Sequence, residues 1–105
     1  MKIVNRGFLI VQPKQAFIDW ATTQDPEMDL FGELEPSVYL IEEDFFEEEP
    51  IIEQNFKNIF FNELEAVSED EDAYPEVNRE NFDAWFSVSA GSAVYDAQKG
   101  GLHAE

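Results

Sequence analysis

The sequence predicts an α/β (α+β) fold, a small two-layer sandwich in which a sheet of three or four strands carries two main helices on one face. Short runs of β-favouring residues alternate with amphipathic helical stretches along the 105 residues. This length suffices for one hydrophobic core. Aromatic residues make up 14% of the chain, so burial of apolar surface can offset the entropy lost on folding. We expect one domain over residues 1–97 and a flexible tail over residues 98–105.

A strand and a helix are predicted near the N-terminus. The strand covers residues 3–11 with an interruption at Asn5-Arg6-Gly7, and its unbroken apolar run Phe8–Val11 is typical of a central or parallel strand. Pro13 suits the first position of a helix, where its missing N–H costs nothing. A helix over residues 13–22 is predicted because apolar residues recur there at helical spacing: Ala16, Phe17, Trp20 and Ala21.

The middle of the chain predicts a loop, a strand and the longest helix. Residues 23–36 hold two prolines, one glycine and five acidic residues, which is typical of a loop. Ser37–Glu42 alternates as a half-buried strand does, with Val38 and Leu40 on the face opposite Tyr39 and Ile41. A helix from Pro50 to about Val67 carries one wide apolar stripe: Ile52, Phe56, Ile59, Phe60, Leu64 and Val67.

After an acidic loop at Ser68–Asp72, the last part of the chain predicts a short helix and a final strand. Asn78 is a favourable N-cap for a helix that carries Phe82, Trp85 and Phe86. A strand over Val88–Tyr95 follows, with Gly91 at a bulge or turn. The element order is therefore β-α-β-α-α-β, and right-handed crossovers would place both main helices on one face. A hairpin at Ala90-Gly91 would instead give a ferredoxin-like arrangement.

The negative charge of the chain is concentrated in its middle. The net charge is −18, and residues 25–76 hold 19 of the 24 carboxylates with Lys57 as their single basic residue. With six basic residues in all, direct binding of nucleic acid through its phosphates is excluded, because the field of the protein repels a polyanion. The chain lacks cysteine, and no segment reads as a signal peptide or a membrane span. We expect a cytoplasmic protein that does not bind membranes.

The sequence gives little support for an enzyme or for a bound cofactor. The single histidine, His103, falls in the predicted tail, where nothing can hold it as a base or a metal ligand. The acidic segments that begin at Asp25 and Asp70 do not match a calcium-binding loop, because Leu30 and Pro75 stand where that loop needs glycine. Glycine-rich phosphate-binding loops are absent from the sequence. We therefore expect no cofactor.

One segment has the composition of a protein-binding surface. It lies between the strand at residues 37–42 and the long helix, and it surrounds two aromatic residues with acids. Such an acidic rim around an aromatic anchor is a known form of protein-binding surface. The alternative is a connection in which one phenylalanine fills the core while the acids are solvated. The candidate partner surface is Glu42, Glu43, Asp44, Phe45, Phe46, Glu47, Glu48 and Glu49.

Three functions are compatible with these features. The preferred hypothesis is a non-enzymatic interaction module that binds a basic protein surface through residues 25–76. A second is a nucleic-acid mimic that occupies a DNA- or RNA-binding protein, which requires carboxylates concentrated in a band. A third is an enzyme that uses carboxylates with Mg²⁺, which requires a pocket where carboxylates converge.

Overall fold

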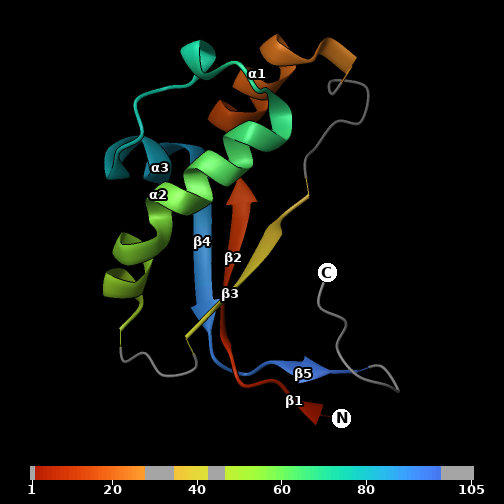
Figure 1. The fold of residues 1–105 in the computed structure, drawn as a ribbon, viewed down its shortest axis with the longest axis vertical. Coiled ribbons are helices and arrows are strands. Elements are labelled where there is room, and N and C mark those ends of the chain that lie inside the picture. The colour runs from red at the N-terminus through yellow and green to blue at the C-terminus, as the bar shows by residue number, and fades with distance from the viewer. Residues whose placement is uncertain (1, 28–34, 43–46, 98–105) are drawn as a thin grey trace.

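A computed structural model describes residues 2–27, 35–42 and 47–97 of the chain. Figure 1 shows the helices gathered at one end of the molecule and a short two-stranded ribbon at the other. The elements in chain order are β1 (Lys2–Ile3), β2 (Gly7–Pro13), α1 (Gln15–Gln24), β3 (Ser37–Ile41), α2 (Glu48–Val67), the 3₁₀-helix η2 (Glu71–Ala73), α3 (Arg79–Trp85), β4 (Phe86–Gly91) and β5 (Tyr95–Asp96). The predicted α+β class is confirmed, and β2, α1, β3, α2, α3 and β4 follow the predicted order, with β1, η2 and β5 in addition. The predicted tail, residues 98–105, lies outside the described residues.

The main sheet has three strands in the order β3-β2-β4, with β2 in the centre, as its apolar run predicted. Both strand pairs are antiparallel, with Phe8 opposite Leu40 in β3 and opposite Gly91 in β4. The expectation of right-handed crossovers is therefore wrong, because that rule applies to parallel strands. The helices nevertheless contribute to a single core on one face of this sheet.

The final strand differs from both of its predicted forms. It ends at Gly91, and the chain then leaves the main sheet so that β5 can pair with β1. Val4 donates to the carbonyl of Val94 at 2.8 Å, and three residues, 5–7, lie between Val4 and Phe8, which pairs with Gly91 in the main sheet. Only two residues, 92 and 93, occupy the same interval on the other strand. One extra residue on one side bends a strand pair, so the ribbon turns away from the main sheet without forming a ferredoxin-like hairpin.

The two faces of the main sheet differ in burial. Leu9 and Val11 of β2 are fully buried, and Tyr39 and Ile41 of β3 point to the same side. The opposite side, which we call the open sheet face, is exposed or partly exposed to solvent. Its side chains are Phe8, Ile10 and Gln12 of β2, Val38 and Leu40 of β3, and Ser87 and Ser89 of β4.

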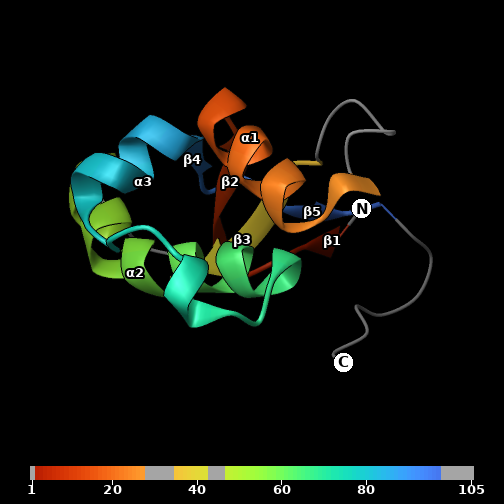
Figure 2. The same ribbon diagram turned by 90° about the horizontal axis from the view of Figure 1, so that it is seen from above.

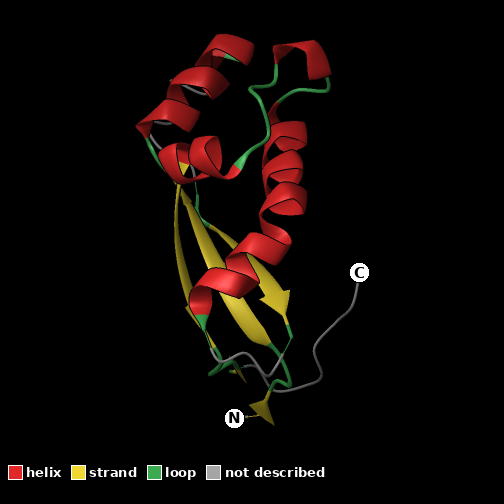
Figure 3. Ribbon diagram, turned by 90° about the vertical axis from the view of Figure 1, so that its left-hand side faces the viewer, coloured by secondary structure: helices red, strands yellow, loops and turns green. Residues whose placement is uncertain are grey.

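Aromatic side chains from all three helices form the centre of the core. Figure 3 shows α2 crossing one face of the sheet, and Figure 2 shows α2 beside α3. Phe60 of α2, Phe82 of α3 and Phe86 of β4 are at most 2% exposed, with neighbouring ring centroids 5.3–5.7 Å apart. The predicted stripe of α2 is buried as expected except for Val67, which is partly buried.

The helices depart from prediction at several points, and α2 begins at Glu48 rather than at Pro50. Pro13 ends β2 rather than beginning a helix, and α1 starts at Gln15 with Lys14 at the N-cap. The face of α1 that enters the core is narrower than predicted, because Ala16 is exposed while Phe17 and Ala21 are buried. Phe86 belongs to β4 and follows the last residue of α3 directly.

Candidate functional site

The predicted partner surface lies in the connection between β3 and α2. Glu42 directly follows β3 and is exposed. Glu47 occupies the N-cap of α2, Glu48 and Glu49 lie in its first turn, and all three are exposed. Negative charge at a helix N-terminus is favourable, by about 0.3–1 kcal/mol per group. Glu43, Asp44, Phe45 and Phe46 lie outside the described residues, so the predicted aromatic anchor is not placed.

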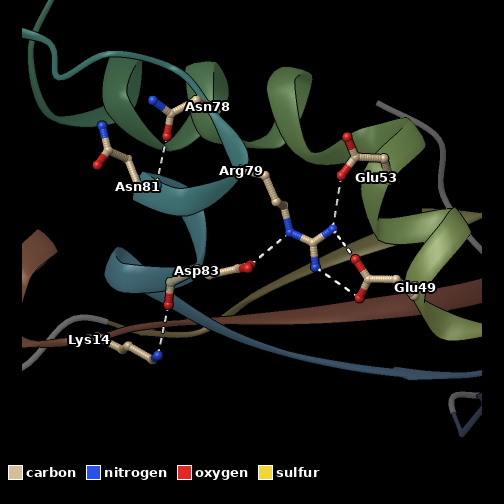
Figure 4. A network of polar contacts seen from close by, with 7 residues as sticks. All are labelled: Lys14, Glu49, Glu53, Asn78, Arg79, Asn81 and Asp83. Atoms are coloured by element: carbon tan, nitrogen blue, oxygen red, sulfur yellow. Dashed lines mark hydrogen bonds and ion pairs between the residues drawn. The ribbon is translucent and has the colours of Figure 1, made fainter.

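Arg79 of α3 binds part of this surface from across the fold. Figure 4 shows its guanidinium between two glutamates of α2 and an aspartate one turn further along α3. Two guanidinium nitrogens donate to the Glu49 carboxylate at 2.5 and 3.1 Å, and one of them also donates to Glu53 at 3.0 Å. The third nitrogen, Nε, donates to Asp83 at 2.8 Å. These bonds, the one to Glu49 first, raise the pKa of Arg79 above its ordinary value.

The ion pairs that join described residues all converge on Arg79. The three carboxylates are well exposed, so each pair adds little to stability, about 0–1 kcal/mol at most. These ion pairs matter more for the charge of this surface than for the stability of the fold. A cation 30 residues away in sequence partly neutralises Glu49 and Glu53. The described acids of the predicted surface that lie outside this network are Glu42, Glu47 and Glu48.

A second group of acids, outside the eight residues of the predicted partner surface, lies at the other end of α2. We call it the 65–72 acidic cluster, and its exposed members are Glu65, Glu69, Asp70, Glu71 and Asp72. The two ends of α2 are well separated in Figure 1, and 20 residues of helix span about 30 Å. Within the described residues, no basic side chain forms an ion pair with this cluster.

Hydrogen bonds hold the segment of this cluster in a defined conformation. The Ser68 hydroxyl accepts from the Asp70 N–H at 3.1 Å, and Asp70 then caps η2 by accepting from the Asp72 N–H at 3.2 Å. The Tyr74 hydroxyl donates to the Ser68 carbonyl at 2.6 Å. The Trp20 indole of α1 donates to the Ala73 carbonyl at 2.9 Å. The predicted solvated loop is therefore an ordered turn attached to the core.

Two aromatic side chains lie beside the 65–72 acidic cluster. Glu65, Glu69, Glu71 and Tyr74 line a surface hollow of about 290 Å³. The ring of Phe61, 40% exposed on α2, packs with its centroid 6.4 Å from that of Tyr74. Partial burial, and then the charges of the neighbouring acids, raise the pKa of the Tyr74 hydroxyl. This part of the surface thus combines an aromatic anchor with an acidic rim, the pattern that the sequence suggested for Phe45 and Phe46.

Glu63 is a buried acid that the sequence analysis did not identify. Its side chain is 8% exposed and lies on the core side of α2. The Tyr39 hydroxyl of β3 donates to its carboxylate in a short hydrogen bond, and the Asn62 amide donates to the Tyr39 oxygen at 3.0 Å. Burial and this bond raise the pKa of Tyr39 above its ordinary value. The Tyr39–Glu63 pair joins α2 to the sheet. The feature of the sequence that indicates it is an acid at a position of α2 that the helical spacing turns towards the core.

The structure brings no metal-binding group together within the described residues. Within residues 2–27, 35–42 and 47–97, no group of three or more acids or histidines could hold a metal ion. Glu65, Glu69 and Glu71, which line the hollow, do not form such a group. His103 lies outside the described residues.

Comparisons with other proteins add no identification. Among the described residues, no helix has the length and apolar character needed to cross a membrane. The chain matches no known protein family, no curated protein and no solved structure.

Proposed function

We propose that this protein is a non-enzymatic interaction module that binds a basic protein surface, with the 65–72 acidic cluster as the main contact. One observation carries the proposal. Five exposed carboxylates lie together, Glu65 near the end of α2 and the other four on the ordered turn that follows it, and no described cation pairs with them. Like charges held at short range repel one another, so the free protein bears a cost that a basic partner would relieve.

The neighbouring aromatic pair supports this choice of surface. Interface energy is concentrated in a few anchors, often aromatic, which charged residues surround and orient. Phe61 and Tyr74 provide such an anchor beside Glu65, Glu69 and Glu71. The segment at Glu42–Glu49 is the secondary contact, because Arg79 already neutralises part of its negative charge.

The arrangement favours a basic protein over the nucleic-acid mimic. A mimic requires a continuous band of charge, since B-DNA presents about one charge per 1.7 Å of its axis. Between Glu53 and Glu65 the exposed positions of α2 carry no carboxylate: Gln54, Lys57, Asn58, Phe61 and Asn62. This gap is about 18 Å of helix, so the acids form two separate groups.

Affinity capture with charge variants tests the proposal. The protein is immobilised at low salt in an extract of its native cells, and bound proteins are eluted at about 0.5 M salt, where the Debye length falls to roughly 4 Å. We expect basic proteins to be retained by the wild type and lost from the variant Glu69→Gln/Asp70→Asn/Glu71→Gln/Asp72→Asn. The Asn at position 70 preserves an oxygen that can cap η2.

A matched control separates the cluster from net charge. The variant Asp19→Asn/Asp25→Asn/Glu27→Gln/Glu35→Gln removes four charges elsewhere on the surface and should retain the same partners. Equal loss from both variants would mean that the partner senses only total charge. If duplex DNA displaces the captured protein, the mimic hypothesis gains support instead.

A further inference from the structure

We propose that the open sheet face is a self-association surface, on which two copies of this chain pack about a two-fold axis. This inference concerns the layer opposite the helices and does not depend on the acidic cluster. It rests on an exposed apolar block, on the local balance of charge, and on the size of the face.

The apolar block is formed by neighbouring positions of β2 and β3. Val38 is 62% exposed and Leu40 is 52% exposed, and they lie opposite Ile10 and Phe8 respectively. Side chains in such cross-strand pairs have Cβ atoms about 4.5–5.5 Å apart, so the four form one continuous patch. The Phe8 ring also covers Gly91 of β4, where an added Cβ would lie 2.4 Å from a ring carbon. The patch therefore reaches towards the third strand.

This face is uncharged in a protein whose net charge is −18. Its other side chains are Gln12, Ser87 and Ser89.

At each end of the sheet one basic residue and one acidic residue lie close together, so the local net charge is near zero. Arg6 precedes β2 beside Glu42, whose carbonyl accepts from the Gly7 N–H at 3.2 Å. Lys14 follows β2 at the end where Glu35 approaches β3.

The charge pattern selects a second copy as the occupant. A basic partner would meet no carboxylate on the open sheet face, so nothing there attracts it. Two copies repel each other through their acidic helix layers, and packing sheet against sheet places those layers on the outside. A two-fold axis brings the same patch of each copy together, and two uncharged apolar patches can pack against each other.

The size of the face predicts a weak, reversible dimer. Three strands of five to seven residues give a surface of about 15 by 20 Å. A stable complex buries about 800 Å² per partner, which is more than this face alone supplies. We therefore expect association that depends on protein concentration and strengthens with salt, because salt screens the repulsion between the two copies.

Sedimentation equilibrium over a range of protein concentration, at low and high salt, tests the inference. We expect the dissociation constant of the wild type to fall as salt is raised, the opposite of the salt response proposed for a basic partner. The variant Val38→Thr/Leu40→Thr keeps β-favouring residues, and we expect it to raise the dissociation constant about tenfold or more. Phe61→Gln, which removes an exposed apolar residue from α2, should leave the constant unchanged.

A second variant guards against an effect on folding. Ser89→Lys leaves the apolar block intact and lowers the net negative charge, yet it places a charge in the proposed interface. We expect it to weaken the dimer. A protein that is monomeric under all conditions would overturn the inference and assign the face to a different occupant. A dimer that salt weakens, or that Val38→Thr/Leu40→Thr and Ser89→Lys both leave intact, would also overturn it.

Discussion

Phe56 and Phe61 lie on the same helix but differ tenfold in exposure, at 4% and 40%. Phe56 packs with its ring 5.8 Å from that of Phe82, within the core. We predict that Phe56→Ala lowers the free energy of unfolding by about 3–5 kcal/mol, through lost burial and the cavity left behind. Phe61→Ala should cost less than half of that. Chemical denaturation of both variants measures the difference, and equal losses would contradict the register assigned to α2.

The titration of Tyr39 links pH to stability. Its pKa is raised above the ordinary value of 10.0 in the folded state, mainly by burial and then by its bond to Glu63. The folded state therefore retains the phenol proton at a pH where the unfolded chain releases it. This stabilisation is fully present below pH 10 and is lost as the pH rises towards the folded-state pKa.

We predict two effects of Tyr39→Phe. At pH 7 the variant should lose about 1–3 kcal/mol, because the buried Glu63 carboxylate loses its hydroxyl donor. Above pH 10 its stability should fall less steeply than that of the wild type. Denaturant unfolding at pH 7, 9 and about 11 tests both effects. Tyr95→Phe, at a tyrosine that is 57% exposed, is the matched control. Unchanged stability at pH 7 would show that another donor satisfies Glu63.

At the scale of elements, periodicity was a reliable guide wherever a segment buries one face. The alternation at Ser37–Glu42 gave β3 the correct inward residues, Tyr39 and Ile41. The stripe of α2 and the Asn78 N-cap of α3, which accepts from the Asn81 N–H at 2.8 Å, are also as predicted. These features depend on residues close in sequence, so a single sequence contains the information.

Strand pairing could not be predicted in the same way. Residues 88–95 read locally as one strand, but the chain divides there because β5 pairs with β1 at the opposite end of the sequence. The antiparallel pairing of β2 with β4 likewise joins residues 73 to 83 positions apart. Such choices depend on the global arrangement, and local β-propensity does not encode them.

The sequence indicated which residue types form the candidate site but only part of its location. The acids at Glu47, Glu48 and Glu49 are exposed as expected, but the pairing of Glu49 with Arg79 depends on how α3 packs against α2. The 65–72 acidic cluster resembled a solvated loop because its order comes from Trp20 and Tyr74, which act from outside the run of acids. Sequence reasoning had no local signal for either contact.

At the scale of the whole molecule, the charges and the apolar surface are separated. The 65–72 acidic cluster and Glu48 belong to α2 or follow it, whereas the open sheet face carries no charge. One side of the protein is therefore suited to a partner of opposite charge, and the other to an uncharged apolar surface. The two proposed interactions use different layers, so both could occur on one molecule.

The excess of negative charge should make the stability of the monomer depend on salt. Among described residues, basic side chains pair only with Glu49, Glu53 and Asp83, and the other exposed acids repel one another within the folded chain. The unfolded chain spreads these charges apart and suffers less repulsion. Salt at about 0.15 M shortens the Debye length to about 8 Å and screens the repulsion mainly in the folded state. We predict that salt raises the melting temperature at pH 7, by an amount on the order of 5 °C.

Thermal unfolding of the wild type and of Glu69→Gln/Asp70→Asn/Glu71→Gln/Asp72→Asn measures how much of this effect comes from the 65–72 acidic cluster. The variant should be more stable than the wild type at low salt and should gain less from added salt, because four repelling charges are gone. Protein concentration is kept low, and Val38→Thr/Leu40→Thr is measured in parallel, because self-association would also add stability as salt rises. A melting temperature that falls with salt would mean that the acids take part in favourable pairs within the fold. The repulsion that a basic partner is proposed to relieve would then be absent, and the proposed function would lose its physical basis.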